Sequence, residues 1–179
     1  MENIILGLLI LRERTIYQLR ERINKGLNLM YSGSTGSIQA AIKKLLKLEY
    51  ICFRETLEKG KHKKTYSITE DGKKYFLKWV NEPLENANIK SPELVKIYFM
   101  GFSDKQSRIR NIEIYIELLK CQYDELCFIC QEGENMEVPK VGQDILKYQL
   151  ATVTYGRDLL KFNIEWYEKF LSNMKGDRL

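Results

Sequence analysis

The sequence predicts a mainly α-helical fold that carries one small β-hairpin. Three observations support this prediction. Residues 36–51 place apolar side chains three and four positions apart, which is the spacing of one helical face. Residues 51–58 and 63–68 are two runs of β-favouring residues joined by a short connection that contains a glycine. Beyond residue 103, apolar positions repeat with helical spacing on both sides of a polar break at residues 131–142.

The first 35 residues predict two helices followed by a turn. The first helix is expected over about residues 3–11. The second begins at Thr15, because Thr15 and Gln18 match the capping box, in which each side chain bonds the backbone N–H of the other residue. Gly26 and the sequence YSGSTG at residues 31–36 then mark the turn that precedes the third helix.

The third helix, GSIQAAIKKLLKLEYI at residues 36–51, has one apolar and one polar face. Gln39, Lys43 and Lys47 fall on the polar face. We therefore expect one side of this helix to join the core and the other to be exposed and basic. The apolar stripe consists of Ile38, Ala41, Ile42, Leu45 and Leu48.

The hairpin is expected to carry cations at its tip. The connection between its strands is formed by Lys59, Gly60, Lys61 and His62. Thr69 then offers a side-chain oxygen as the N-cap of a fourth helix, EDGKKYFLKWV. A helix, a hairpin with a basic tip and a second amphipathic helix, in this order, predict a winged helix-turn-helix domain.

The second half of the chain predicts long helices. A polar stretch bounded by two prolines divides the chain into a winged-helix domain at residues 1–82, a linker at 83–92 and a helical dimerisation domain at 93–179. A short helix is expected from Glu93, and Ser103 with Gln106 form a capping box that opens a long helix. Its apolar positions follow a heptad seam. They are Ile109, Ile112, Ile116, Leu119, Tyr123, Leu126 and Cys130.

The last helix, expected over about residues 143–174, is apolar on two adjacent stripes and so needs two partners. One partner is the preceding long helix. We assign the other to a second copy of the chain, which predicts a homodimer with Leu159, Phe162 and Trp166 in its interface. The first stripe consists of Ile145, Tyr148, Thr152, Tyr155, Leu159, Phe162 and Trp166. The second consists of Leu146, Leu150, Val153, Leu160, Ile164, Tyr167 and Leu171.

Charge is distributed unevenly. Residues 1–82 hold 16 Lys and Arg against 9 Asp and Glu, a net charge of +7, whereas residues 83–179 hold 13 against 15, or −2. A basic domain favours a polyanionic partner, because binding phosphates releases condensed counterions. The apolar run at residues 4–11 is too short for a membrane span and lacks the basic start of a secretory signal. We therefore expect a cytoplasmic protein, without a membrane partner, whose four cysteines are thiols.

Four sequence blocks in the first 80 residues are informative together: ILGLL at 5–9, TIYQL at 15–19, GSIQAAIKKLLKLEYI at 36–51 and GKHKKTYSITEDG at 60–72. In this order and spacing they resemble the PadR family of bacterial transcriptional regulators. The resemblance implies a dimeric repressor or activator that binds operator DNA and often responds to a small molecule. The chain departs from the family pattern at Gln39, where a tyrosine is common, and at Lys61 and His62, where proline and arginine are frequent.

The candidate DNA-binding residues lie on the third helix and in the hairpin. Hydroxyls and free N–H groups at a helix start can hold a phosphate, and clustered cations neutralise phosphates. Two plainer interpretations stay open: the hydroxyls only cap the helix, or the lysines are an ordinary solvated surface. The set is Ser34, Thr35, Ser37, Gln39, Lys43, Lys47, Arg54, Lys61, His62, Lys63 and Lys64.

The expected partners are double-stranded DNA, a second copy of the chain and a small aromatic or amphipathic effector. The effector prediction rests on an aromatic stripe that could line a pocket. Such a stripe is more often plain interface core. Its members are Tyr148, Tyr155, Phe162 and Trp166.

Other functional classes find little support. With one histidine and no paired nucleophile, the sequence predicts no catalytic residues and no cofactor, so we expect no enzyme. Cys127 and Cys130 form a CxxC on the heptad seam, where core packing of Cys130 is favoured over metal or redox sensing. The alternative is a winged-helix adaptor for protein partners, which the +7 charge of residues 1–82 disfavours. The operator, the regulated genes and the sign of regulation stay open, with a repressor preferred.

Overall fold

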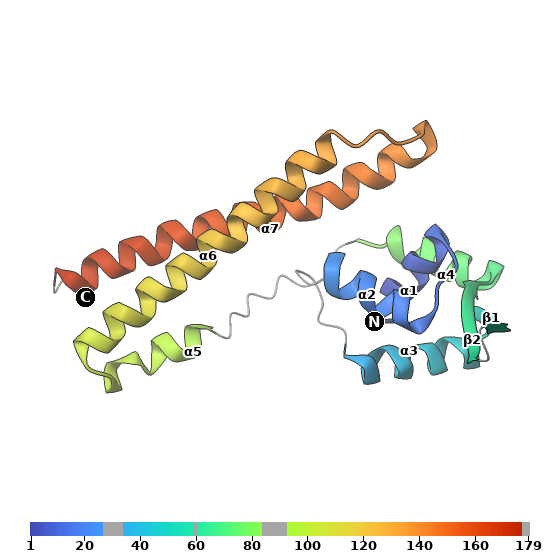
Figure 1. Ribbon diagram of the computed structural model, residues 1–179, viewed down its shortest axis with the longest axis horizontal. Coiled ribbons are helices and arrows are strands. Elements are labelled where there is room, and N and C mark those ends of the chain that lie inside the picture. The colour runs from blue at the N-terminus through green and yellow to red at the C-terminus, as the bar shows by residue number, and fades with distance from the viewer. Residues whose placement is uncertain (27–33, 59–60, 84–92, 177–179) are drawn as a thin grey trace. The chain divides into compact units, whose positions relative to one another are not determined.

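The computed structural model describes residues 1–26, 34–58, 61–83 and 93–176 (Figure 1). The chain divides into two compact units, Met1–Ala87 and Asn88–Leu179. The fold is mainly helical with one antiparallel hairpin, as the sequence predicted. The first unit contains α1 Glu2–Leu11, α2 Ile16–Gly26, α3 Thr35–Lys47, β1 Ile51–Glu58, β2 Lys61–Ile68 and α4 Glu70–Val80. The second contains α5 Glu93–Tyr98, the 3-10 helix Met100–Phe102, α6 Lys105–Glu134 and α7 Lys140–Lys175.

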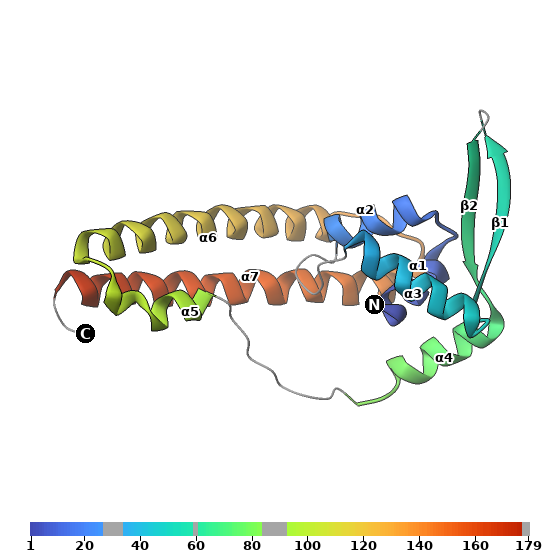
Figure 2. The ribbon, with the colours of Figure 1, turned by 90° about the horizontal axis from the view of Figure 1, so that it is seen from below.

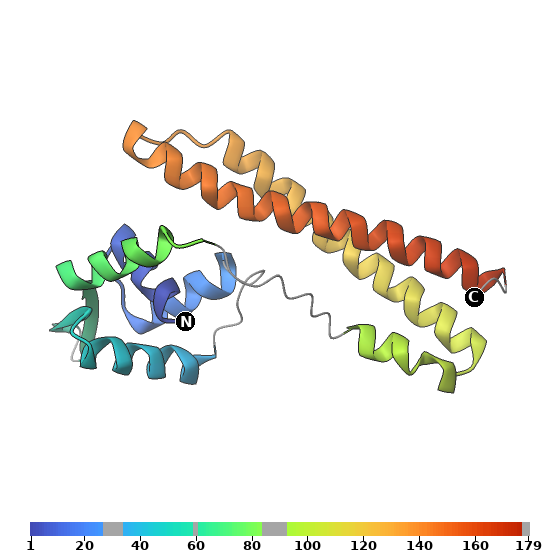
Figure 3. The same cartoon turned by 180° about the vertical axis from the view of Figure 1, so that it is seen from behind.

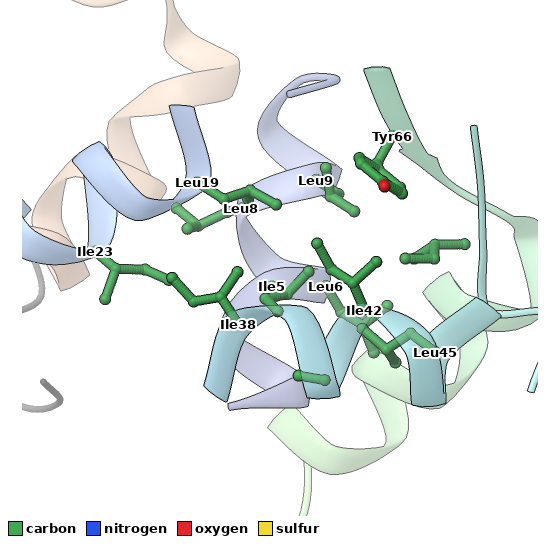
Figure 4. Packing of buried hydrophobic residues seen from close by; sticks show 12 residues of the cluster. Ile5, Leu6, Leu8, Leu9, Leu19, Ile23, Ile38, Ile42, Leu45 and Tyr66 are labelled. Carbon is green, nitrogen blue, oxygen red and sulfur yellow. The ribbon is translucent and has the colours of Figure 1, made fainter. Parts of the chain in front are cut away.

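Helix α1 forms the centre of the first unit. It is apolar nearly all round, so its side chains contact several neighbouring elements at once. Figure 4 shows the side chains of α1 lying between those of α2 and α3, with Tyr66 of β2 at one edge. The buried α3 residues Ile38, Ile42 and Leu45 belong to the stripe predicted for the third helix. The core is completed by Ile5, Leu6, Leu8, Leu9, Leu19, Ile23, Ala41 and Ile51.

Capping residues set the starts of three helices in this unit. The Thr15 and Gln18 capping box is confirmed, with the Gln18 N–H donating to Thr15 Oγ1 at 3.2 Å and the Thr15 N–H donating to Gln18 Oε1 at 2.9 Å. Ser34 caps α3 by accepting from the Ser37 N–H. Thr69 caps α4 as predicted, accepting from the Gly72 N–H at 3.1 Å. A side chain at Gly72 would overlap the carbonyl oxygen of Tyr50, so this position requires glycine.

Two boundaries in the first unit differ from the sequence prediction. Helix α3 ends at Lys47, because Glu49 adopts the left-handed conformation at φ 57°, and Leu48 is therefore 47% exposed instead of buried with the stripe. Strand β2 already begins at Lys61, which places Lys61 and His62 in the strand and not in the connection. Lys59 and Gly60 lie outside the described residues.

Helices α6 and α7 form a long antiparallel pair (Figures 2 and 3). The predicted start of α6 was wrong: Asp104, not Ser103, is the N-cap and accepts from the Ser107 N–H at 2.9 Å, because the carboxylate sits one residue nearer the first helical turn. Two ion pairs join the helices, Lys120 to Glu168 at 3.0 Å and Lys175 to Glu113 at 2.6 Å. Five residues of the predicted α6 seam are buried: Ile112, Ile116, Leu119, Leu126 and Cys130.

The two stripes of α7 have different surroundings. The second stripe is buried or half-buried, and its Leu160, Ile164 and Tyr167 pack into the core shared with α6. All but one member of the first stripe is exposed, the exception being the half-buried Thr152. A single chain therefore covers one stripe and leaves the other open. No helix among the described residues is both long and apolar enough to cross a lipid bilayer.

Candidate nucleic-acid interface

The exposed face of α3 is basic. Gln39, Lys43 and Lys47 all lie on it, separated by four residues each and therefore aligned along the helix. Lys44 differs from them, because its Nζ lies 2.9 Å from the Glu2 carboxylate. That ion pair lowers the pKa of Glu2 to about 2, chiefly through the hydrogen bond from Lys44. Lys43 and Lys47 have no carboxylate at ion-pair distance among the described residues, so their charges are available to a polyanion.

The start of α3 adds hydroxyl groups to this face. Ser34 Oγ accepts from the Ser37 N–H at 3.1 Å, and Ser37 Oγ donates to the Ser34 carbonyl oxygen at 2.8 Å. Both serine side chains are therefore engaged in capping. Thr35 Oγ1 accepts a hydrogen bond from Arg20 Nη1 at 3.4 Å.

Arg20 is a candidate that the sequence prediction missed. It lies on α2, and its guanidinium is 5.6 Å from the ring centre of Tyr17 and within hydrogen-bond distance of Thr35. No carboxylate pairs with Arg20 within the part of the chain that the structure describes. Its only signal in the sequence was a place on the polar side of an amphipathic helix. The tertiary contact with Thr35 places this cation at the start of α3.

The hairpin divides its cations between two faces. Residues directly opposite each other in an antiparallel pair point to the same face, and alternate pairs point to opposite faces. Arg54 pairs with Thr65 and Lys63 with Thr56, so these two cations belong to one face. Lys64 and His62 belong to the other, which nearer the base of the hairpin carries the buried Tyr66.

Ion pairs within the hairpin region reduce its available charge. Arg54 Nη2 lies 2.6 Å from the Glu13 carboxylate, and Lys64 Nζ lies 2.9 Å from Glu55. The hydrogen bond between Lys64 and Glu55 raises the lysine pKa and lowers that of the carboxyl group, so both groups stay charged at neutral pH. Lys64 also lies 4.5 Å from the ring centre of Phe53. Arg54 and Lys64, both predicted to bind DNA, are thus already partnered by acids.

The predicted dimerisation and effector residues lie together on the open side of α7. Leu159 is 45% exposed and Trp166 40%, although the Trp166 ring stacks on Phe170 with 5.2 Å between ring centres. Tyr148 and Tyr155 are each 71% exposed, and Phe162 is 60% exposed. Neither of the two large cavities of this unit is lined by these side chains.

The cysteines show no arrangement for metal binding. Cys130 is buried, and its Sγ lies 4.0 Å from Thr154 Oγ1 on α7. Cys127 is half-buried one turn earlier. Among the described residues, no three His, Cys, Asp or Glu side chains gather as metal ligands would.

Comparison with known proteins connects both units to transcriptional regulators. A family model described as the virulence activator alpha C-terminal domain matches residues 89–175. The negative transcriptional regulator PadR of Bacillus subtilis strain 168 is 25% identical over 97% of this chain and 96% of its own length.

Solved structures share the fold over nearly the whole chain. Bacillus subtilis PadR in complex with operator DNA superposes with a TM-score of 0.80 at 22% identity, covering 97% of this chain and 98% of that one. The same protein in complex with p-coumaric acid superposes with a TM-score of 0.73 at 21% identity, covering 97% of this chain and 94% of that one. The Vibrio cholerae virulence activator AphA superposes with a TM-score of 0.71 at 15% identity, and the match covers 98% of each chain.

These relatives are regulators and not enzymes. The sequence blocks of the first unit, the winged-helix fold and the match to PadR along nearly the full length agree with one another. In its sequence and its fold the chain is therefore similar, over nearly its whole length, to PadR-like winged helix-turn-helix transcriptional regulators.

Proposed function

We propose that this chain is a homodimeric, cytoplasmic transcriptional repressor that binds an inverted-repeat operator in double-stranded DNA. The observation that carries the proposal is the exposed stripe of Gln39, Lys43 and Lys47 on α3, whose two lysines have no acidic partner among the described residues. A helix with this face fits the major groove, where phosphates flank base edges. The PadR structure that contains operator DNA supports this assignment by its shared fold.

Gln39 is the proposed base reader of the stripe. Its amide presents a donor and an acceptor, which match the N6 and N7 edge of adenine. It lies in the N-terminal half of α3, the part that enters the groove in helix-turn-helix proteins. Lys43 follows one turn later and Lys47 one turn after that, where they can neutralise phosphates along the same path.

The open stripe of α7 supports the proposed dimer. A contiguous apolar face of this size favours a partner, and a second copy presents the same face around a two-fold axis. Leu159, Phe162 and Trp166 form the proposed interface. Tyr148 and Tyr155 flank it and stay candidates for contacts with a small aromatic or amphipathic effector. The p-coumaric acid complex of PadR supports an effector of that class.

Selection from random duplex DNA tests the function. We expect the full-length protein to enrich an inverted repeat whose half-sites lie about one helical turn apart, because a two-fold dimer presents two α3 helices to one face of the duplex. Gln39→Ala should relax the preference at one position of each half-site and leave the spacing unchanged. Enrichment of no sequence over repeated rounds, with a well-folded protein, would contradict the proposal.

The hairpin should contribute affinity without sequence preference. Replacing Lys61 and Lys63 of β2 together by alanine should weaken binding to all duplexes alike, because lysines at a phosphate add affinity that does not depend on base sequence. The slope of log affinity against log salt should flatten by up to about two units, since each phosphate contact contributes about one.

Fluorescence anisotropy at several salt concentrations measures this slope. The matched control replaces Lys73 and Lys74, which are held by Glu70 and Asp71 at the start of α4, and should leave the slope unchanged. An equal slope for wild type and the hairpin variant removes the hairpin from the interface.

A further inference from the structure

Two cysteines share one side of α6 next to α7. Cys127 and Cys130 are three positions apart in this helix, so their side chains project from the same side, one turn apart. Cys130 is buried, and its Sγ lies 4.0 Å from Thr154 Oγ1 on α7. Cys127 is half-buried, and both sulfurs are free thiols. One thiol can therefore meet a small molecule from solution while the other is sheltered beside it.

The spacing of this pair permits a disulfide. Residues three apart in an α-helix have Cα atoms about 5 Å apart, which is within the range that disulfides span. Their Cβ atoms are about 5–6 Å apart, whereas a disulfide brings them to about 4 Å. Forming the bond therefore tightens this turn of α6 and moves Cys130 toward Cys127. Cys121 points about 120° away from Cys127 around α6, so it is not placed to bond Cys127 within one chain.

Polar groups from both helices surround the more exposed thiol. A hydrogen bond with Cys127 is the main cause that raises the pKa of Tyr123, so this phenol is protonated at neutral pH and keeps its O–H group. The pKa of Arg157 on α7 is raised chiefly by its hydrogen bond to Asp158, and to a smaller degree by the two cysteines, which places the guanidinium near both sulfurs. Nε and Nη2 of Arg157 bond Asp158 Oδ1 at 3.0 and 2.8 Å, so Nη1 keeps its donors. A small molecule with two oxygens finds hydrogen-bonding groups on both sides of Cys127.

The turn that contains Cys130 leads into a close approach of α6 and α7. Gly133 follows one turn later and is buried, and a Cβ at this position would overlap the side chain of Leu150 on α7. Tight packing of this kind leaves little room to absorb a shift of the preceding turn. A bond between the two cysteines withdraws Cys130 Sγ from Thr154 and displaces the turn beside this contact. Oxidation of the pair therefore changes how α7, which carries the open apolar stripe, packs on α6.

We propose that Cys127 and Cys130 form a thiol–disulfide switch that a hydroperoxide oxidises. The Cys127 sulfur attacks one peroxide oxygen: an S–O bond forms, the O–O bond breaks, and the thiol proton leaves with the other oxygen as water or an alcohol. The Cys130 sulfur then attacks the Cys127 sulfur, the S–O bond breaks, and the hydroxyl group leaves as water with the Cys130 proton. The two thiols together lose two electrons, and the hydroperoxide gains them.

The regulatory consequence of this switch rests on the proposed function. Because the disulfide changes the packing of α7 on α6, we expect the oxidised protein to dimerise more weakly. Its affinity for operator DNA should then be at least about tenfold lower, since the two half-sites are no longer bound together. The thiol pools of a reducing cytoplasm open such a disulfide again, so the change is reversible.

Hydrogen peroxide titrated into the full-length protein, followed by alkylation and peptide mass spectrometry, tests the pair. Cleavage after glutamate releases residues 126–132, which contain Cys127 and Cys130 and no other cysteine. We expect this peptide to lose the mass of both thiol hydrogens, and dithiothreitol to restore it. In Cys130→Ala the reaction should stop at a sulfenic acid on Cys127, which dimedone traps. The matched control Cys121→Ser removes an exposed thiol of the same helix and should leave disulfide formation unchanged.

Fluorescence anisotropy with labelled operator measures the consequence for DNA binding. Cys127→Ser should keep the affinity of the reduced protein and lose the response to peroxide, whereas Cys121→Ser should respond as the wild type does. Dithiothreitol should restore the affinity of the oxidised protein, which separates the disulfide from methionine oxidation. Circular dichroism of the reduced variants checks the fold, and Cys127→Ala replaces Cys127→Ser if the serine destabilises α6.

The outcomes separate the switch from the proposed function. The switch is overturned if Cys127 and Cys130 both persist as thiols under peroxide treatment that oxidises Cys52 or Cys121, or if the disulfide joins two copies of the chain instead. A disulfide within the pair that leaves operator affinity unchanged overturns the coupling to DNA binding, as does an equal loss of affinity in Cys127→Ser. Failure of the reduced protein to bind any DNA overturns the proposed function and leaves the peptide result intact.

Discussion

Lys43→Glu together with Lys47→Glu should lower affinity for operator DNA by at least about a hundredfold at physiological salt. Each substitution removes a phosphate contact and places a carboxylate beside the phosphate backbone, so the loss exceeds that of alanine. Both side chains are exposed and have no acidic partner among the described residues, so the fold should tolerate the change. Anisotropy titration with labelled operator measures the affinity, and thermal unfolding measures the stability.

The matched control is Lys73→Glu with Lys74→Glu. It changes the net charge of the same unit by the same amount, but these lysines lie in the first turns of α4, paired with Glu70 and Asp71. A loss confined to the α3 variant shows that position, and not total charge, determines binding. Equal losses in both variants would reduce the role of α3 to general electrostatic attraction, and no loss in either would remove α3 from the interface.

Phe162→Asp should convert the protein from a dimer to a monomer at micromolar concentration. In the single chain Phe162 is 60% exposed, so the aspartate remains hydrated and the α6 and α7 pair should stay folded. In the proposed dimer the same carboxylate is buried without a partner, which costs several kcal/mol and raises the dissociation constant by at least about a hundredfold. Sedimentation equilibrium gives the mass, and circular dichroism checks the helix content.

Lys161→Asp serves as the control for this substitution. Lys161 is also exposed and is the adjacent residue on α7, but it lies outside both apolar stripes. It should leave the dimer intact. A monomeric wild-type protein, or a Phe162→Asp variant that remains dimeric, would place the open stripe of α7 outside any interface between copies. Loss of the dimer should also weaken operator binding, because the two half-sites are no longer bound together.

Local pattern determined most of the secondary structure. The helical stripes of α3 and α6, the Thr15 and Gln18 capping box and the two strands depend on side-chain periodicity and on residues within four positions of each other, so they were predictable. The end of α3 was harder to predict. The chain turns there through a positive φ at Glu49, whereas a helix end of this kind is usually marked in the sequence by a glycine. At α6 the predicted cap, Ser103, was wrong by one residue, because the chain uses the neighbouring Asp104.

The amphipathic pattern also identified the basic face of α3 and the open stripe of α7, because an excess of cations or apolar residues on one helical side is visible in sequence. Contacts between residues far apart in the sequence could not be predicted in this way. The ion pairs of Arg54 with Glu13 and of Lys44 with Glu2, and the contact of Arg20 with Thr35, join residues brought together only by folding. They decide which predicted cations keep an available charge. The cavity that is lined by residues of α5, the 3-10 helix, α6 and α7 likewise depends on how these elements pack together, a tertiary arrangement that no periodicity encodes.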